Sequence, residues 1–158
     1  MKTKTLLLIC LFSGIGLTQL SAQIPPPTNG KTGTVSFWET LSYPQEMIAE
    51  DGTVLYVLDA TLSSHVQAHY KNGVIIQADY EAHGNAISKK TGEVFKMTEI
   101  GKQTFSSWDP LTGFDYFTVH LIGDHGTRLK GEAILDFSTW EYTIIKISWP
   151  GDKYWDGD

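Results

Sequence analysis

The sequence predicts an all-β protein, an antiparallel meander of about eight strands that closes into an up-and-down barrel. Runs of β-branched and aromatic residues alternate with turn signals, and no window carries the apolar repeat of an amphipathic helix. The turns are short and rich in glycine, which requires antiparallel neighbours because a parallel crossover needs a dozen or more residues. A β-sandwich is the alternative architecture. We favour the barrel because closure removes free sheet edges.

The first residues predict an export signal. Lys2 and Lys4 precede an apolar run over 6–17, and the small residues Ser21 and Ala22 end the segment. We therefore expect residues 1–22 to be a signal peptide, cleaved after Ala22, and the mature protein to be periplasmic or secreted. The apolar run is shorter than the roughly 20 residues that cross a bilayer, so we expect no membrane insertion.

Composition narrows the class of partner. The chain has 158 residues with 12 basic and 18 acidic side chains, and without Lys2 and Lys4 its net charge is 10 − 18 = −8. This sign disfavours a nucleic-acid partner. Cys10 is the sole cysteine and leaves with the signal, so the mature chain has no disulfide.

The rest of the chain divides simply. We expect an extended Pro-rich leader over 23–33, a single barrel domain over 34–150 and a polar C-terminal tail over 151–158. One helix is expected over 43–50, with Pro44 in its first turn. The expected strands are 34–38, 53–59, 64–70, 74–87, 94–105, 114–122, 127–137 and 141–149.

Alternation predicts which faces are buried. In 127–137 the charged side chains fall on one face, and the apolar or small ones on the other: Leu129, Gly131, Ala133, Leu135 and Phe137. We take the second set as the inner face. In 114–122, His120 shares a face with Phe114 and Tyr116, which predicts a packed histidine.

The segment 64–88 predicts a hairpin around Asn72-Gly73. A two-residue turn would pair His69 with Ile76, whereas a three-residue loop pairs Ala68 with Ile76. The second register keeps apolar side chains opposite apolar ones, so it is favoured. It places Gln67 opposite Gln77 and His65 opposite Asp79.

This register gathers a polar column on one face of the hairpin: His65, Gln67, His69, Gln77, Asp79, Glu81 and His83. The column either lines a cavity or forms a wetted outer wall, and polar columns usually face water. An inward column would bind a ligand, and its predicted ligand-binding residues are His65, Gln67, Gln77, Asp79, Tyr80 and Tyr116.

The residues of this column suggest two kinds of chemistry. Asp79 opposite His65 would orient the imidazole and raise its pKa, as a general base requires, so His65 and Asp79 are the alternative catalytic pair. On a strand, His65 and His69 lie about 13 Å apart, too far to share one Zn²⁺. We therefore expect no metal and no cofactor.

Three sequence features carry a family resemblance: the run 82–86, the Thr91-Gly92-Glu93 turn, and the segment 126–131. Together with the strand rhythm, they resemble small exported bacterial proteins built on the allene-oxide-cyclase or dirigent-like β-barrel. The resemblance implies the barrel fold. In plant relatives the barrel interior binds hydrophobic intermediates and steers their cyclisation or coupling. The resemblance implies no catalytic residue in this chain.

These observations predict a non-enzymatic exported barrel that binds a small, partly apolar ligand or a protein partner. One alternative is a cyclase- or isomerase-like enzyme that uses the barrel interior, with His65 as acid or base. The other is a structural or adhesive surface protein, which needs no pocket.

Overall fold

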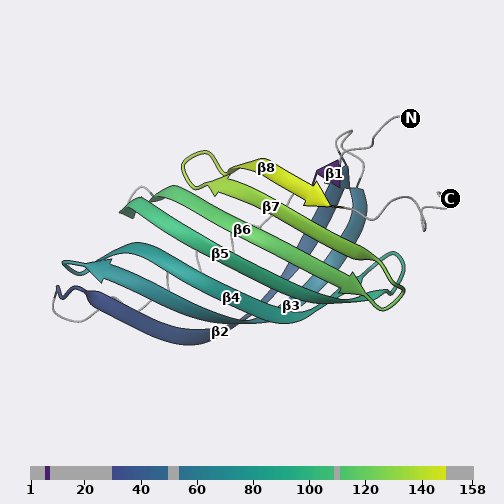
Figure 1. Cartoon of the computed structure of the whole chain (residues 1–158), viewed down its shortest axis with the longest axis horizontal. Helices are drawn as coiled ribbons and strands as arrows, with labels where there is room; N and C mark the ends of the chain where they lie inside the picture. The colour runs from purple at the N-terminus through teal and green to yellow at the C-terminus, as the bar shows by residue number, and fades with distance from the viewer. Residues whose placement is uncertain (1–5, 8–29, 50–53, 109–110, 149–158) are drawn as a thin grey trace.

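Each strand hydrogen-bonds to the strand before it in the chain, and all pairs are antiparallel (Figure 1). The computed structural model describes residues 6–7, 30–49, 54–108 and 111–148. Its strands are β1 (Leu6–Leu7), β2 (Gly33–Ala49), β3 (Val54–Lys71), β4 (Val74–Ser88), β5 (Val94–Trp108), β6 (Leu111–Gly123), β7 (Arg128–Asp136) and β8 (Glu141–Ser148). The described residues contain no helix long and apolar enough to span a membrane.

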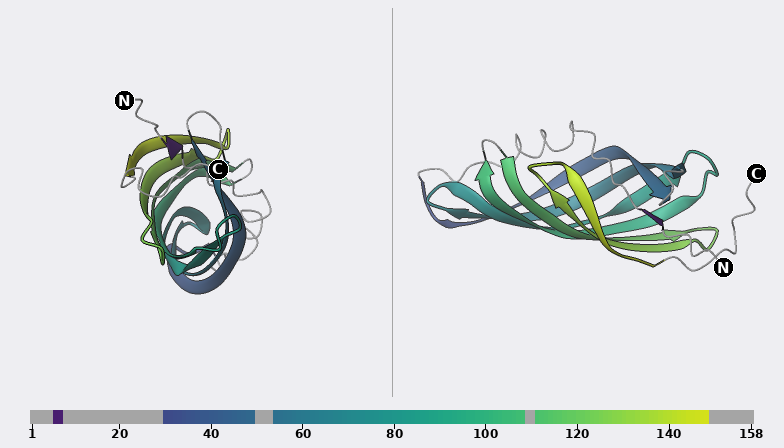
Figure 2. Two further views of the ribbon diagram at one scale, coloured as in Figure 1. Left: turned by 90° about the vertical axis from the view of Figure 1, so that its right-hand side faces the viewer. Right: turned by 90° about the horizontal axis from the view of Figure 1, so that it is seen from above.

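The predicted all-β meander is confirmed, and its eight strands form one sheet. The β-sandwich alternative is therefore wrong. The sheet curls round on itself, as the end-on view in Figure 2 shows. In the described part of the chain no ladder joins β8 to β2, so the predicted closure is not confirmed. The short β1 pairs with β2 and also contacts β8.

Two element predictions are wrong. The helix expected over 43–50 does not form, because β2 continues as a strand to Ala49. At Pro44 the sheet pairs β2 with β3, and no second neighbour is described there, so the missing N–H of proline is tolerated as on other edge strands. The strands expected over 53–59 and 64–70 are one strand, since exposed Thr61 and Ser63 alternate with buried Leu62 and Ser64.

The β3–β4 hairpin combines a tight turn with a bulge. Asn72 and Gly73 both have positive φ, 52° and 80°, and Lys71 pairs with Val74 across this two-residue turn. Tyr70 then pairs with Ile75 but His69 with Gln77, so Ile76 is an extra residue in β4. The predicted three-residue loop is wrong. The prediction that apolar side chains lie opposite apolar ones is still correct, because the one-residue bulge compensates for the loop being one residue shorter.

The concave side of the sheet is the apolar core. Leu129, Ala133 and Leu135 of β7 are buried as predicted, and so is Phe137 directly after it. Larger side chains from the other strands fill the same side, among them Leu58, Leu62, Phe95, Met97, Phe117 and Leu121. The prediction of a packed His120 is wrong, because this residue lies on the exposed face of β6. The buried face of β6 instead carries Asp115, Phe117, Val119 and Leu121.

Candidate functional site

The polar column lies on the outer face of the sheet. Its members in β3 and β4 are exposed or half-buried, whereas the alternate residues Val66, Ala68, Ala78 and Ala82 are buried. The inward arrangement that the predicted ligand-binding set required is therefore not formed. The column is the wetted outer wall.

The pairing inside the column also differs from the prediction. The shorter turn and the bulge each move β4 by one position relative to the prediction, so His65 lies opposite Glu81 and Gln67 opposite Asp79. Asp79 Oδ2 is hydrogen-bonded to His69 Nε2 at 2.9 Å and accepts from Gln77 Nε2 at 2.7 Å. The prediction that His65 lies directly opposite Asp79 is therefore wrong. His65 instead packs against Trp38 of β2, with ring centroids 4.9 Å apart and the rings tilted by 30°.

A groove of about 450 Å³ crosses this outer face from β3 to β6. Five of the six predicted ligand-binding residues line it. The sixth, Gln77, does not line it but donates a hydrogen bond to Asp79, which does. The lining is His65, Gln67, Asp79, Tyr80, Glu81, Ile100, Gly101, Lys102 and Tyr116. Ile100 is 51% exposed and Tyr116 is 46% exposed, so the groove offers apolar surface beside two carboxylates and one ammonium. Its volume lies in the range of small-molecule sites, about 300–1,000 Å³.

On the opposite, concave side, two carboxylates are almost fully buried. Glu99 of β5 is 3% exposed and Asp115 of β6 is 2% exposed. The hydroxyl of Tyr80 lies between them, 3.0 Å from Glu99 Oε1 and 3.2 Å from Asp115 Oδ2. Tyr43 donates to Glu99 Oε2 at 3.2 Å, and Gln103 Nε2 donates to Asp115 Oδ2 at 3.1 Å. We call these five residues the acid cluster.

Local sequence explains how the acid cluster is placed. Glu99 continues the inward alternation of Phe95 and Met97, and Asp115 continues that of Phe117 and Val119. Tyr80 pairs with Gly101, and its ring lies where a side chain at Gly101 would be. An added Cβ there would lie 2.2 Å from Tyr80 Cζ. The missing side chain thus lets the tyrosine reach across the strand to both acids.

Burial controls protonation in this cluster. Desolvation, and then the charge of Asp115, raises the pKa of Glu99 to about 7, although hydrogen bonds from Tyr80 and Tyr43 oppose the shift. Desolvation likewise raises the pKa of Asp115 to about 6. The hydroxyl of Tyr80 has one proton and can donate to one carboxylate at a time. Near neutral pH the cluster holds a second proton, on whichever of Glu99 and Asp115 does not accept from Tyr80.

Sequence reasoning named Tyr80 but missed Glu99, Asp115, Gln103 and Tyr43. A signal was present, because Glu99 and Asp115 stand in phase with large apolar residues on strands whose other face is polar or mixed. A carboxylate in that phase predicts a buried charge, and strongly perturbed pKa values mark candidate functional sites.

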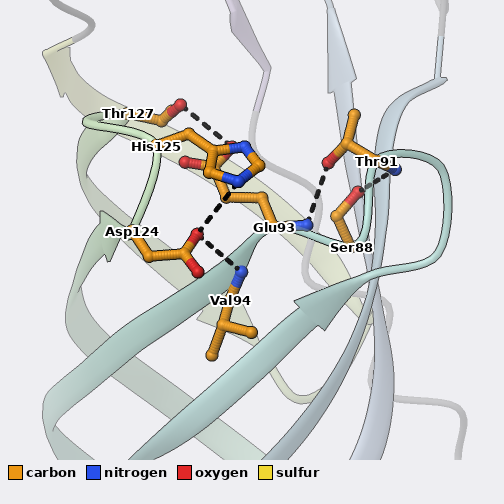
Figure 3. A network of polar contacts seen from close by, with 7 residues as sticks. All are labelled: Ser88, Thr91, Glu93, Val94, Asp124, His125 and Thr127. Atoms are coloured by element: carbon orange, nitrogen blue, oxygen red, sulfur yellow. Dashed lines mark hydrogen bonds and ion pairs between the residues drawn. The ribbon is translucent and has the colours of Figure 1, made fainter.

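One group in the described residues has the side chains to hold a metal ion. Glu93, Asp124 and His125 each bring a ligand atom within 4.8 Å of the others, at the end of the sheet where β5 begins and β6 ends (Figure 3).

Comparisons with protein families, with curated proteins and with solved structures find no match for this chain.

Proposed function

We propose that this protein is an exported, non-enzymatic binding protein whose outer groove takes a small, partly apolar ligand. The main support for this proposal is the groove of about 450 Å³, because it brings side chains from four strands together in one hollow of the outer face. Export rests on the signal predicted over residues 1–22.

The lining favours a particular ligand chemistry. Ile100 and Tyr116 stand exposed at the groove and would cover an apolar ring or chain. Asp79 and Glu81 accept hydrogen bonds, and Lys102 is the one ammonium in the lining. The lining is therefore acidic on balance. We propose a compact apolar body that carries hydroxyl or amine donors.

The packing of the concave side supports an external site. Phe95, Phe137, Leu135 and Leu121 are each no more than 1% exposed and fill much of the concave side. The sequence-based expectation of an interior ligand is replaced here by a ligand on the other face of the same strands.

A fluorescence titration with Nile red, a neutral and partly apolar dye, tests the proposal. The dye is expected to bind the wild-type protein, and Tyr116→Ala is expected to weaken that binding about tenfold, which corresponds to about 1.4 kcal/mol of lost apolar contact. Native mass spectrometry of the exported protein would then identify any compound that co-purifies.

Ile122→Ala is the matched control. Ile122 is 50% exposed on the same face of β6 but lies outside the groove. Equal losses in the Tyr116 and Ile122 variants would mean that the dye covers the whole wall without a site. An unchanged affinity in Tyr116→Ala would reject the groove.

The acid cluster favours a second candidate, acid–base catalysis on the concave side in a cyclase- or isomerase-like enzyme. Glu99 and Asp115 have raised pKa values close to the range that proton transfer at neutral pH requires. The same titration separates the candidates. A ligand on the concave side would respond to Glu99→Gln and not to Tyr116→Ala.

We also infer that the curled sheet closes into the predicted barrel, by β8 meeting β2. Two facts support this inference: β1, which pairs with β2, contacts β8, and the strands already curl round a common axis (Figure 2). Leu6 and Leu7 of β1 belong to the segment expected to be removed. In the processed chain β2 itself would have to complete the closure, as the resemblance to allene-oxide-cyclase-like barrels implies.

A further inference from the structure

We propose that Glu93, Asp124 and His125 form a binding site for a first-row divalent transition metal, with Zn²⁺ as the ion of reference. The three residues come from two neighbouring turns. Glu93 directly precedes β5, and the other two lie in the turn between β6 and β7. Because Phe95 pairs with Gly123, β5 and β6 bring these turns to the same end of the sheet.

Glu93 supplies the observation that points to a missing ligand. Its residue is 4% exposed, and its Oε1 atom is buried without a hydrogen-bond partner. The other oxygen, Oε2, accepts from Thr127 Oγ1 at 3.1 Å. One edge of the carboxylate is thus fixed by the protein while the other lacks the donor or cation that a buried carboxylate oxygen requires.

The space around that oxygen is shaped by Gly123. A Cβ at Gly123 would lie 1.9 Å from Glu93 Oε1, so this position must lack a side chain for the carboxylate to lie here. Figure 3 shows the Glu93 carboxylate directed toward the imidazole of His125, with the carboxylate of Asp124 extending from the same turn as His125.

The spacing of the other two groups suits an ion better than a direct contact. His125 Nε2 lies 3.8 Å from Asp124 Oδ1, too far for a hydrogen bond. Two ligands that bind a tetrahedral Zn²⁺ at about 2.0–2.1 Å are separated by roughly 3.4 Å. A small movement of the exposed His125 side chain would bring the pair to that separation.

Backbone contacts hold the two turns together. Val94 N donates to Asp124 Oδ1 at 3.1 Å, and Asp124 N donates to Val94 O at 3.0 Å. Asp124 is therefore positioned before any ion arrives, and Oδ1, which accepts one hydrogen bond, keeps a second lone pair for an ion. A bound ion would join the two turns across the β5–β6 ladder.

The donor set selects the class of metal. One imidazole and two carboxylates suit zinc and its first-row neighbours, whereas Ca²⁺ and Mg²⁺ prefer sites made of oxygen atoms. Asp124 and His125 are exposed, so the remaining positions of the ion face solvent. The arrangement of three protein ligands with an open position is one that zinc adopts.

The test is a calorimetric titration of the purified, chelator-treated protein with Zn²⁺, paired with thermal unfolding. We expect one Zn²⁺ per chain and a raised Tm, since an ion that binds only the folded state stabilises it. Ca²⁺ at the same concentration is expected to leave Tm unchanged. His125→Ala should weaken Zn²⁺ binding by more than the roughly 10- to 100-fold that loss of an outer hydrogen-bond partner costs a metal site.

Two histidine variants are matched controls. His120 is exposed on β6 near the same turn, and His83 is bonded to Glu81 on the outer wall, so His120→Ala and His83→Ala should retain the Zn²⁺ affinity. Glu93→Gln keeps the size of the side chain and should lose the affinity. If that variant fails to fold, His125→Ala still decides, because His125 is an exposed turn residue.

Three results would overturn the proposal: no Zn²⁺ bound by the wild-type protein, an unchanged affinity in His125→Ala, or an equal loss in either control. These outcomes leave the groove on the outer wall untouched, because none of the three metal-site residues lines it.

Discussion

At the scale of single residues, the acid cluster couples folding to pH. Glu99 and Asp115 have ordinary pKa values of 4.5 and 3.8, which rise to about 7 and about 6 in the folded protein. At a pH between its ordinary pKa and its raised pKa, each carboxyl group is protonated in the folded chain and ionised in the unfolded chain. The free energy of unfolding contributed by the pair is therefore fully present below about pH 4 and is lost as the pH rises through about 6 to 7.

We expect the free energy of unfolding to fall by about 3 kcal/mol or more from pH 4.5 to pH 8 on account of this pair, since one pKa unit corresponds to about 1.4 kcal/mol. The double variant Glu99→Gln/Asp115→Asn has no carboxyl to ionise and should lose most of this dependence. Urea denaturation at a series of pH values measures both proteins.

Glu81→Gln is the control for that measurement, because Glu81 is an exposed acid on the outer face of the same sheet. It should retain the pH dependence of the wild-type protein. A double variant that loses stability with pH as steeply as the wild type would show that the acid cluster does not hold its protons.

At the scale of elements, the ring of Tyr80 in β4 lies over Gly101 of β5, where the side chain of another residue would be. Gly101→Ala would place a Cβ 2.2 Å from Tyr80 Cζ, so the ring must move and its hydroxyl must leave Glu99 and Asp115. We expect a loss of about 3 kcal/mol, which combines overpacking with a lost hydrogen bond to a charged group. Chemical denaturation measures it.

Gly33→Ala is the matched substitution, because nothing lies within 4 Å of a Cβ added at Gly33. Its effect should stay within about 0.5 kcal/mol, as for most surface changes. Comparable losses in the two variants would mean that the cost comes from glycine replacement in strands and not from Tyr80.

The β3–β4 hairpin shows how far sequence predicts an element. The positions of the turn and of both strands followed from Asn72-Gly73 and from alternation, and the matching of faces was right. The exact pairing was not, because the turn is one residue shorter than predicted and the bulge at Ile76 adds one more residue, which together move every later pair by two residues and preserve the faces. Alternation shows which face each residue is on, but registers that differ by two residues place the same residues on the same faces. The sequence therefore could not decide whether His65 lies opposite Asp79 or opposite another residue of the same face.

At the scale of the whole molecule, the edges of the sheet decide its behaviour. β2 has a described partner on its second side at Ile48 and Ala49, which pair with β1. An exported chain that has lost residues 1–22 would leave this edge free unless the sheet closes.

We expect a chain that begins at Gln23 to fold with β-rich circular dichroism and a single cooperative transition, because β1 contributes two residue pairs to the sheet. If the processed sheet closes, amides on both strands at the seam, β2 and β8, should exchange slowly with solvent. Hydrogen exchange read by mass spectrometry on these peptides measures this. Rapid exchange along either strand would show that the sheet is open.

The amino-acid sequence by itself determined the all-β class, the order of the strands, most turns and the buried face of β7, because these follow from alternation and from glycine at tight bends. Tertiary structure decided the rest. Pro44 lies on an edge strand rather than in a helix, the polar column faces outward, and Tyr80 joins two buried acids from β5 and β6. Each of these depends on which residues of distant strands face each other across the sheet, and sequence periodicity along one strand contains no such information.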